Sequence, residues 1–185
     1  MAAGRPFTAS VFIATSLDGY IARADGDIEW LTSRGEKAGD TGYDDFAAGV
    51  DTLVIGRGTY EKVLTFGEWP YEGKRVAVLS TRLPEDADPR VTVHRDLGAL
   101  MRDLTGHGAR RVYVDGGQVI QAFLRAGLLD DLTITTVPVL LGGGLPLFGA
   151  LDGDVGLVHR STRVLGAGLV QSSYTVEGTA AGAGA

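Results

Sequence analysis

Two short segments of this chain place glycines and polar side chains where a buried strand runs directly into a helical pattern. They are Leu53-Val-Ile-Gly-Arg-Gly-Thr-Tyr60 and Val112-Tyr-Val-Asp-Gly-Gly-Gln-Val119. Such a junction presents unpaired backbone N–H groups and the positive end of a helix dipole at the carboxyl edge of a sheet, where phosphate groups bind. Two of them in one small domain favour a ligand with more than one phosphate, and the candidate is a dinucleotide.

Neither segment matches the Rossmann fingerprint Gly-x-Gly-x-x-Gly. Glu61 stands where the third glycine would follow Gly56 and Gly58, and Asp115-Gly-Gly-Gln118 lacks the Gly-x-Gly spacing. Taken singly, each glycine is equally well explained as part of a tight turn. The presence of two such junctions favours the phosphate-binding interpretation, with Gly56, Gly116 and Gly117 as its candidate residues.

Cationic and hydroxyl side chains follow the second and third predicted strands. Arg57 and Thr59 open one helix, and Ser80-Thr81-Arg82 follows the next strand. Guanidinium and hydroxyl donors suit a ribose 2′-phosphate, which forms charge-assisted hydrogen bonds. The alternative is a solvated arginine beside a turn-forming Ser-Thr pair. If these residues bind the phosphate, the cofactor is NADPH rather than NADH, for which an acidic ribose ligand is expected.

Composition narrows the class of protein. The 185 residues suit one domain, which we expect to span residues 1–177 and to be followed by a disordered tail over 178–185. A formal charge of −6 argues against nucleic acid or an anionic membrane as partner. With no cysteine, thiol catalysis and disulfides are excluded, and the three histidines show no metal-ligand spacing. We therefore expect no metal site. No membrane span or signal peptide is evident, so we expect a cytoplasmic protein.

The hydrophobic pattern alternates strands and helices over most of the chain. Strands are predicted near 7–15, 51–55, 75–79, 91–93, 110–114, 130–140, 154–165 and 168–176, and helices near 41–49, 57–66, 96–105 and 117–127. Alternation of this kind implies right-handed crossovers and a parallel sheet. The last two strands are joined by Gly166-Ala-Gly168, which predicts an antiparallel hairpin at one edge. The expected class is α/β, with a mostly parallel eight-stranded sheet and about four helices.

These motifs together resemble the dihydrofolate reductase superfamily, most closely its bacterial branch of reductase domains from bifunctional riboflavin-biosynthesis deaminase-reductases. The resemblance covers about residues 7–176. The matched features are Ala14-Thr-Ser-Leu-Asp-Gly-Tyr-Ile-Ala22 with Trp30, Val54-Ile-Gly-Arg-x-Thr-Tyr60, Leu79-Ser-Thr81, Val114-Asp-Gly-Gly117 and Pro138-Val-Leu-Leu-Gly-Gly-Gly-Leu-Pro-Leu-Phe148. It implies the three-layer fold of that superfamily, a stand-alone reductase and a homodimer.

The resemblance also implies roles for individual positions. Ala14 and Ile21 fall beside the nicotinamide, and the residues already assigned to the 2′-phosphate fall on the adenosine side. Gly117, Gln118, Val119 and Ile120 fall along the pyrophosphate and the middle of the cofactor. Residues 22–30 correspond to a mobile loop that closes over the reacting ring.

Several positions depart from the riboflavin-pathway pattern. Phe12 replaces a lysine, Asp115 replaces a glutamate, and Tyr43-Asp-Asp-Phe46 replaces a basic segment, while an expected Asp-Asn-Pro is missing. No acid of the 36–45 stretch matches the pterin-binding carboxylate of dihydrofolate reductases unambiguously, and a solvated helix face is the favoured interpretation there. Asp115 and Asp18 are the candidate catalytic acids, although Asp18 could equally form a turn.

The sequence therefore predicts an NADPH-dependent reductase that transfers hydride to a C=N or C=O bond of a small heterocyclic or sugar-like substrate. Two alternatives stay open. One is a genuine riboflavin-pathway aminopyrimidine reductase or dihydrofolate reductase. The other is a non-catalytic NADP(H)-binding regulatory protein that lacks the substrate residues.

Overall fold

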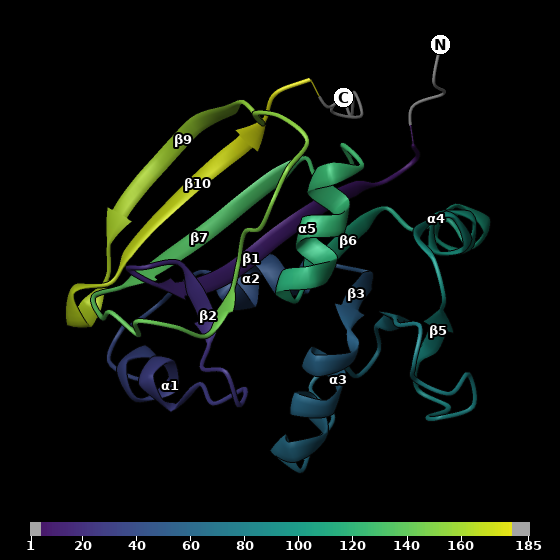
Figure 1. Cartoon of the computed structure of the whole chain (residues 1–185), viewed down its shortest axis with the longest axis horizontal. Coiled ribbons are helices and arrows are strands. Elements are labelled where there is room, and N and C mark those ends of the chain that lie inside the picture. The colour runs from purple at the N-terminus through teal and green to yellow at the C-terminus, as the bar shows by residue number, and fades with distance from the viewer. Residues whose placement is uncertain (1–4, 179–185) are drawn as a thin grey trace.

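The computed structural model of this chain describes residues 5–178 and is built on one large twisted sheet (Figure 1). Its eight strands lie in the order β5-β4-β3-β6-β1-β7-β10-β9. They are β1 (Thr8–Ser16), β3 (Thr52–Gly56), β4 (Arg75–Leu79), β5 (Thr92–His94), β6 (Arg111–Asp115), β7 (Asp131–Val137), β9 (Leu157–Val164) and β10 (Val170–Val176). All pairs from β5 to β7 are parallel, and β10 is antiparallel to both β7 and β9. The predicted α/β class, with a parallel sheet and an antiparallel edge, is confirmed.

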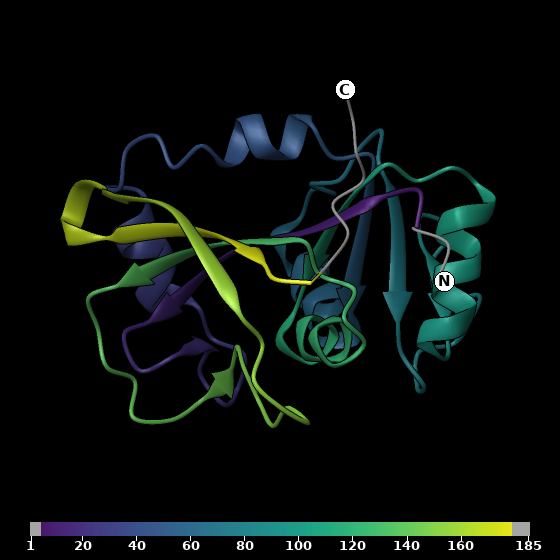
Figure 2. The ribbon, with the colours of Figure 1, turned by 90° about the horizontal axis from the view of Figure 1, so that it is seen from above.

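Helices cover both faces of this sheet, as buried parallel strands require. They are α1 (Glu29–Gly35), α2 (Tyr43–Ala48), α3 (Arg57–Val63), α4 (Leu97–Gly106) and α5 (Gly117–Arg125), with 3-10 turns at Leu64–Phe66 and Gly166–Gly168. Figure 2 shows α2 and α5 on opposite sides of the sheet. No helix between residues 5 and 178 has both the length and the apolar character needed to cross a bilayer.

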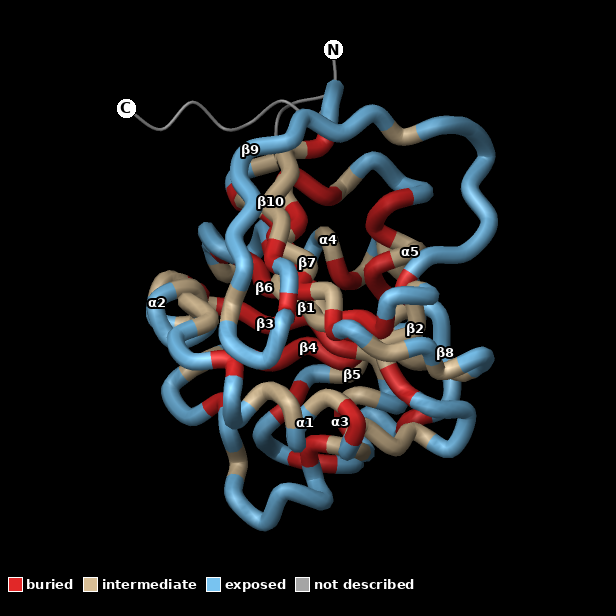
Figure 3. The backbone as a smooth tube through the Cα atoms, turned by 90° about the vertical axis from the view of Figure 1, so that its left-hand side faces the viewer, coloured by how far each residue is buried: buried red, intermediate tan, exposed pale blue. Residues whose placement is uncertain are grey.

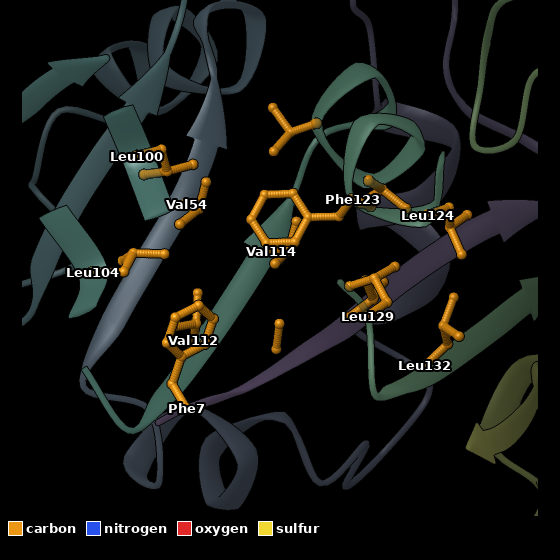
Figure 4. Close-up of a cluster of buried hydrophobic side chains, with 14 of the residues drawn as sticks. Phe7, Val54, Leu100, Leu104, Val112, Val114, Phe123, Leu124, Leu129 and Leu132 are labelled. Carbon is orange, nitrogen blue, oxygen red and sulfur yellow. The ribbon is translucent and has the colours of Figure 1, made fainter. Parts of the chain in front are cut away.

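The main core lies between the sheet and the pair α4 and α5. Phe123 of α5 and Leu100 and Leu104 of α4 are fully buried against Val54 and Val114 of the central strands (Figure 4). Successive side chains along a strand point to opposite faces of the sheet. The strand residues that alternate with these therefore form a second core on the other face, under α2 and α3. A continuous apolar strand such as β3 is therefore buried on both faces.

The opposite end of the sheet is open. Every residue of β9 is exposed, and this strand is pale blue along its whole length in Figure 3. The hairpin turn before β10 puts Ala167 at a φ of 56°, flanked by the two glycines that the sequence marked as a turn. The predicted hairpin is confirmed.

Several predicted elements have different bounds. Helix α1 and the two short strands β2 (Tyr20–Ala22) and β8 (Leu145–Pro146), which pair in a small second sheet, were not predicted. They are too short for a periodic hydrophobic pattern, and β2–β8 pairing depends on contacts across more than a hundred residues. The strand expected over 130–140 ends at Val137 because Pro138 follows, and the one expected from 154 begins at Leu157. Except for Gly178, the predicted tail lies outside the described residues.

Candidate active site

A cavity of about 970 Å³ opens at the carboxyl ends of β3, β4 and β6. The structure brings together most of the residues that the sequence assigned to the cofactor. Those that line the cavity are Ile21, Gly56, Arg57, Thr59, Ser80, Thr81, Arg82, Gly116, Gly117, Gln118 and Val119. Its volume lies at the upper end of the range usual for small-molecule sites.

The two strand–glycine–helix junctions are neighbours because β3 pairs directly with β6, with Ile55 opposite Asp115. Helix α3 follows one strand and α5 follows the other, so both helices begin at the same edge (Figure 1). Gly116 has a φ of 98°, and a Cβ on it would lie 2.7 Å from Thr59 Oγ1 of the other junction. Glycine is required there both for its backbone angle and for this close approach.

Gly117 is needed for a different reason from the one the sequence suggested. We expected the pyrophosphate to occupy the space of a side chain at this position. Instead, a Cβ on Gly117 would lie 2.6 Å from the Pro146 carbonyl oxygen and 3.3 Å from Ile21 Cδ1. The β2–β8 pair therefore packs against the start of α5, so a valine at this position should disturb the fold as well as any bound phosphate.

The adenosine-phosphate side of the cavity is a turn that follows β4. Ser80 Oγ accepts hydrogen bonds from the backbone N–H groups of Arg82 (3.2 Å) and Leu83 (3.0 Å), so this hydroxyl is the turn former of the alternative interpretation. The side chains of Thr81 and Arg82 are exposed to the cavity. Arg57 also lines it, but its guanidinium already donates to Glu61 Oε1 at 2.8 Å.

Two further arginines line the cavity that sequence reasoning missed. Arg95 follows β5, and Arg125 lies on the face of α5 that also carries Gln118 and Gln121. The helical spacing of Gln118, Gln121 and Arg125 could have identified this face from sequence. The remaining missed lining residues are Gly58, Leu79, Asp96, Leu97, Ala122, Leu145 and Pro146.

Two predicted cofactor residues do not line the cavity. Ile120 is fully buried on the inner face of α5, within the main core. Ala14 packs beside the buried Trp30 of α1 and Val137 of β7. Both therefore support neighbouring elements with their side chains.

Asp115 ends β6 with its side chain on the sheet face opposite α5, the face that Tyr113 shares. Burial raises the pKa of Asp115 to about 6, and a hydrogen bond from the Gly116 N–H to Oδ1 (2.8 Å) opposes that shift only in part. The carboxyl also acts on nearby phenols. Burial, followed by the charge of Asp115, raises the pKa of both Tyr71 and Tyr113.

Aromatic rings border this acid. Phe12, Tyr43, Phe46 and Tyr113 form one cluster, with ring centroids 5.0 Å apart for Phe12 and Phe46 and 5.1 Å apart for Phe46 and Tyr113. Phe12 and the Tyr43–Phe46 segment, which replace basic positions of the riboflavin-pathway pattern, are thus in mutual contact. An acid bordered by aromatic rings retains its proton more readily than one in water.

Asp18 has a contrasting environment. It is exposed, and its carboxylate accepts hydrogen bonds from the backbone N–H groups of Leu141 (3.1 Å) and Gly142 (2.7 Å). The Ser16 hydroxyl, together with these N–H groups, lowers the pKa of Asp18 to about 2. Asp18 does not line the cavity, and it fastens the turn before β2 to the loop before β8 as a turn former does.

Two of the three histidines share one carboxylate. His94 Nε2 and His107 Nδ1 lie 2.9 Å and 3.2 Å from the two carboxylate oxygens of Asp103. None of these three side chains lines the cavity, although His94 directly precedes Arg95. Over residues 5–178, no cluster of three or more His, Cys, Asp or Glu residues could hold a metal ion.

Comparison with known proteins now identifies the family. The RibD C-terminal domain profile matches residues 8–171. The chain belongs to the RibD C-terminal domain family. A crystal structure of a putative riboflavin biosynthesis protein from Shewanella sp. PV-4 is 40% identical, covers 92% of this chain and 99% of its own, and superposes with a TM-score of 0.83.

Other relatives of this RibD C-terminal domain vary in length. The uncharacterized protein YwjB of Bacillus subtilis (strain 168) is 37% identical over 160 residues, which are 84% of this chain and 91% of YwjB. The riboflavin biosynthesis protein RibD of Corynebacterium ammoniagenes is 29% identical, and the match spans 80% of this chain but only 49% of RibD. Dihydrofolate reductase of Enterococcus faecalis has the same fold, with a TM-score of 0.62 at 17% identity, covering 94% and 98% of the two chains. The predicted dihydrofolate reductase-like fold is confirmed.

Proposed function

We propose that this RibD C-terminal domain is an NADPH-dependent reductase that delivers hydride to a C=N or C=O bond of a small heterocyclic or sugar-like substrate. The observation that supports it most is the single cavity into which two strand–glycine–helix junctions and an arginine-bearing turn open together. The family supports a reductase of the riboflavin-pathway kind.

The residues present fit the phosphates of NADPH. Gly56 and Gly116 have no side chains, so the backbone of both junctions is accessible to a ligand. Larger residues would not fit, because a Cβ on Gly56 would lie 3.2 Å from Val119 Cγ2 and a Cβ on Gly116 would lie 2.7 Å from Thr59 Oγ1. Backbone N–H groups at the start of α5 suit the pyrophosphate. Arg82 and Thr81 offer charge-assisted and neutral donors to a 2′-phosphate. The Enterococcus faecalis dihydrofolate reductase of the same fold was solved with NADP(H).

Bound NADPH would supply the hydride, and the chain's own residues would orient the partners and manage the proton. Asp115 is the acid we assign to proton transfer, because it directly precedes Gly116 and Gly117 of the cavity wall and burial raises its pKa to about 6, near the range in which a general acid works best. Asp18 keeps its negative charge down to pH values near 2, and its hydrogen bonds place it as a loop brace rather than a proton donor. Ile21 of β2 lines the cavity and would exclude water from the reacting ring.

A second candidate is the aminopyrimidine reductase of riboflavin biosynthesis, which the name of the Corynebacterium relative favours. The contacts of Phe12 with Tyr43 and Phe46 argue against it, because aromatic rings stand where the pathway pattern has cations for a phosphorylated substrate. We therefore expect slow turnover of the phosphorylated aminopyrimidine and of dihydrofolate.

Turnover with a panel of oxidised heterocycles tests the proposal, with NADPH oxidation followed by its ultraviolet absorbance. We expect at least one uncharged heterocycle to be reduced faster than the two pathway substrates, and Asp115→Asn to slow it. Tight NADPH binding without turnover of any substrate would favour the regulatory alternative. A kcat/KM for dihydrofolate of about 10⁶ M⁻¹s⁻¹ or more would show a true dihydrofolate reductase.

A further inference from the structure

Arg95 lines the cavity and contacts three residues of the segment that follows β4. Its Nη1 donates hydrogen bonds to the carbonyl oxygens of Ser80 (3.0 Å) and Leu83 (2.6 Å), and its Nε lies 3.5 Å from Glu85 Oε1. The residue itself follows β5 directly, one position before the N-cap of α4. One guanidinium therefore holds both ends of the turn that follows β4.

The rest of this turn is fixed at its ends and free in its middle. The Ser80 N–H donates to the His94 carbonyl oxygen at 2.9 Å, and Leu83 is buried in the second core. Between them, the side chains of Thr81 and Arg82 are exposed and make no hydrogen bond or ion pair with any residue in the range 5–178. Their donors are therefore available to a ligand, in a direction that the fixed ends determine.

Arg95 itself is poorly placed to act as the main phosphate ligand. Its Nη1 is committed to two carbonyl oxygens, and its charge is partly offset by Glu85. Arg82 has no such carboxylate neighbour among the described residues, whereas Arg57 is paired with Glu61. The arrangement separates an arginine that fixes the turn from one that is free to bind.

We propose that Arg95 is a positioning residue for the 2′-phosphate, which sets the preference for NADPH over NADH by holding the Ser80–Leu83 turn so that Thr81 and Arg82 face the phosphate. This proposal rests on the proposed NADPH binding. It implies that Arg95 affects the affinity for NADPH more than the affinity for NADH, because the ribose 2′-phosphate is the group that distinguishes the two nucleotides.

The test is fluorescence titration of the full chain with NADPH and with NADH, in wild type, Arg95→Ala, Arg95→Lys and Arg102→Ala. Arg102 is a matched control, since it is an exposed arginine on the adjacent α4 that does not line the cavity. We expect Arg95→Ala to lower the ratio of the two dissociation constants about tenfold while the NADH value changes less than twofold. Arg102→Ala should keep the wild-type ratio, and Arg95→Lys should restore part of it.

A double-mutant cycle with Arg82→Ala separates positioning from direct contact. If Arg95 acts through the turn, adding Arg95→Ala to Arg82→Ala should weaken NADPH binding by less than a further twofold. Full additivity would overturn positioning in favour of a direct phosphate contact. Equal weakening of NADPH and NADH by Arg95→Ala would reduce Arg95 to a general structural role, with circular dichroism and the lysine variant reporting whether the fold is intact. A wild-type chain that binds neither nucleotide, or both equally, would instead contradict the proposed cofactor.

Discussion

The cavity and the surroundings of Asp115 meet at the carboxyl end of β6 but differ in charge. Four arginines line the cavity: Arg57, Arg82, Arg95 and Arg125. Asp115, on the opposite face of the sheet, is bordered by tyrosines, and burial rather than a cation determines its pKa. Cations suit a ligand that brings its own negative charge, whereas an uncompensated acid suits one that must give or take a proton.

This difference shows why strand parity matters to the site. Val114 and Asp115 are adjacent in sequence, yet the first enters the core under α5 and the second faces the aromatic cluster. In the function we propose, β6 therefore carries both a phosphate-binding edge and a proton-transfer residue without bringing a guanidinium next to the acid.

Replacing the acid should have the largest effect. Asp115→Asn should lower kcat for a reducible substrate by about 10²- to 10⁴-fold, because the amide cannot supply the proton. Affinity for NADPH should change less than twofold, since the side chain faces away from the cavity. In the wild type, kcat/KM should decline as pH rises through about 6, as the protonated form is lost. A profile that increases through this range would assign Asp115 the role of a base.

Enlarging the glycine at the start of α5 should have the next largest effect, on stability. Gly117→Val should lower the free energy of unfolding by about 2–3 kcal/mol, since the new Cβ would meet the Pro146 carbonyl. Thermal unfolding by circular dichroism measures this. As a control, Gly58→Ala in α3 meets nothing within 4 Å and should stabilise the chain by about 0.5–1 kcal/mol. An unchanged Tm for Gly117→Val would show that β8 is not held against α5.

The uncompensated acid should also make stability depend on pH. The pKa of Asp115 is about 6 in the folded chain against an ordinary value of 3.8, so between these pH values the folded state binds a proton that the unfolded state has lost. Stability from this group is therefore present at low pH and falls as pH rises from about 4 to about 6. Asp115→Asn should then be more stable than wild type at pH 7, by about 3 kcal/mol, and within about 0.5 kcal/mol of it near pH 4. Urea unfolding at the two pH values would show whether the difference changes in this direction.

The smallest effect is expected at the arginine that is already paired. Glu61→Gln should release Arg57 and tighten NADPH binding by about two- to fivefold, while removing an exposed i,i+4 pair that contributes about 0.3–0.5 kcal/mol. Nucleotide titration at low and moderate salt measures the increase in NADPH affinity and how far salt screening reduces it. If the affinity for NADPH stays the same, Arg57 does not face the phosphate.

The sequence predicted the parallel part of the fold and the cavity edge because these depend on local patterns. Buried apolar runs ending in glycine predict strands and junctions, and Arg57 and Arg82 lie beside them. Contacts between distant segments were not predictable in this way. Neither the Pro146 carbonyl against Gly117 nor the Arg95 guanidinium across the Ser80–Leu83 turn has any signature in local spacing.

The same limit applies to the two candidate acids. Asp18 and Asp115 each precede a glycine and were ranked together from sequence. Their pKa values differ in direction because Asp18 receives hydrogen bonds from a loop more than a hundred residues away, while Asp115 is half-buried at the end of a central strand, where desolvation is the main influence. Only the tertiary arrangement separates the brace from the acid that we propose as the proton donor.

Titration of the wild-type chain with NADPH and NADH, under the same salt conditions, is the most direct test of the proposed cofactor site. One charge-assisted contact to the 2′-phosphate contributes roughly 1.5–3 kcal/mol, so we predict a dissociation constant at least about tenfold lower for NADPH. Equal dissociation constants for the two nucleotides would contradict the assignment of Thr81, Arg82 and Arg95 to a phosphate site.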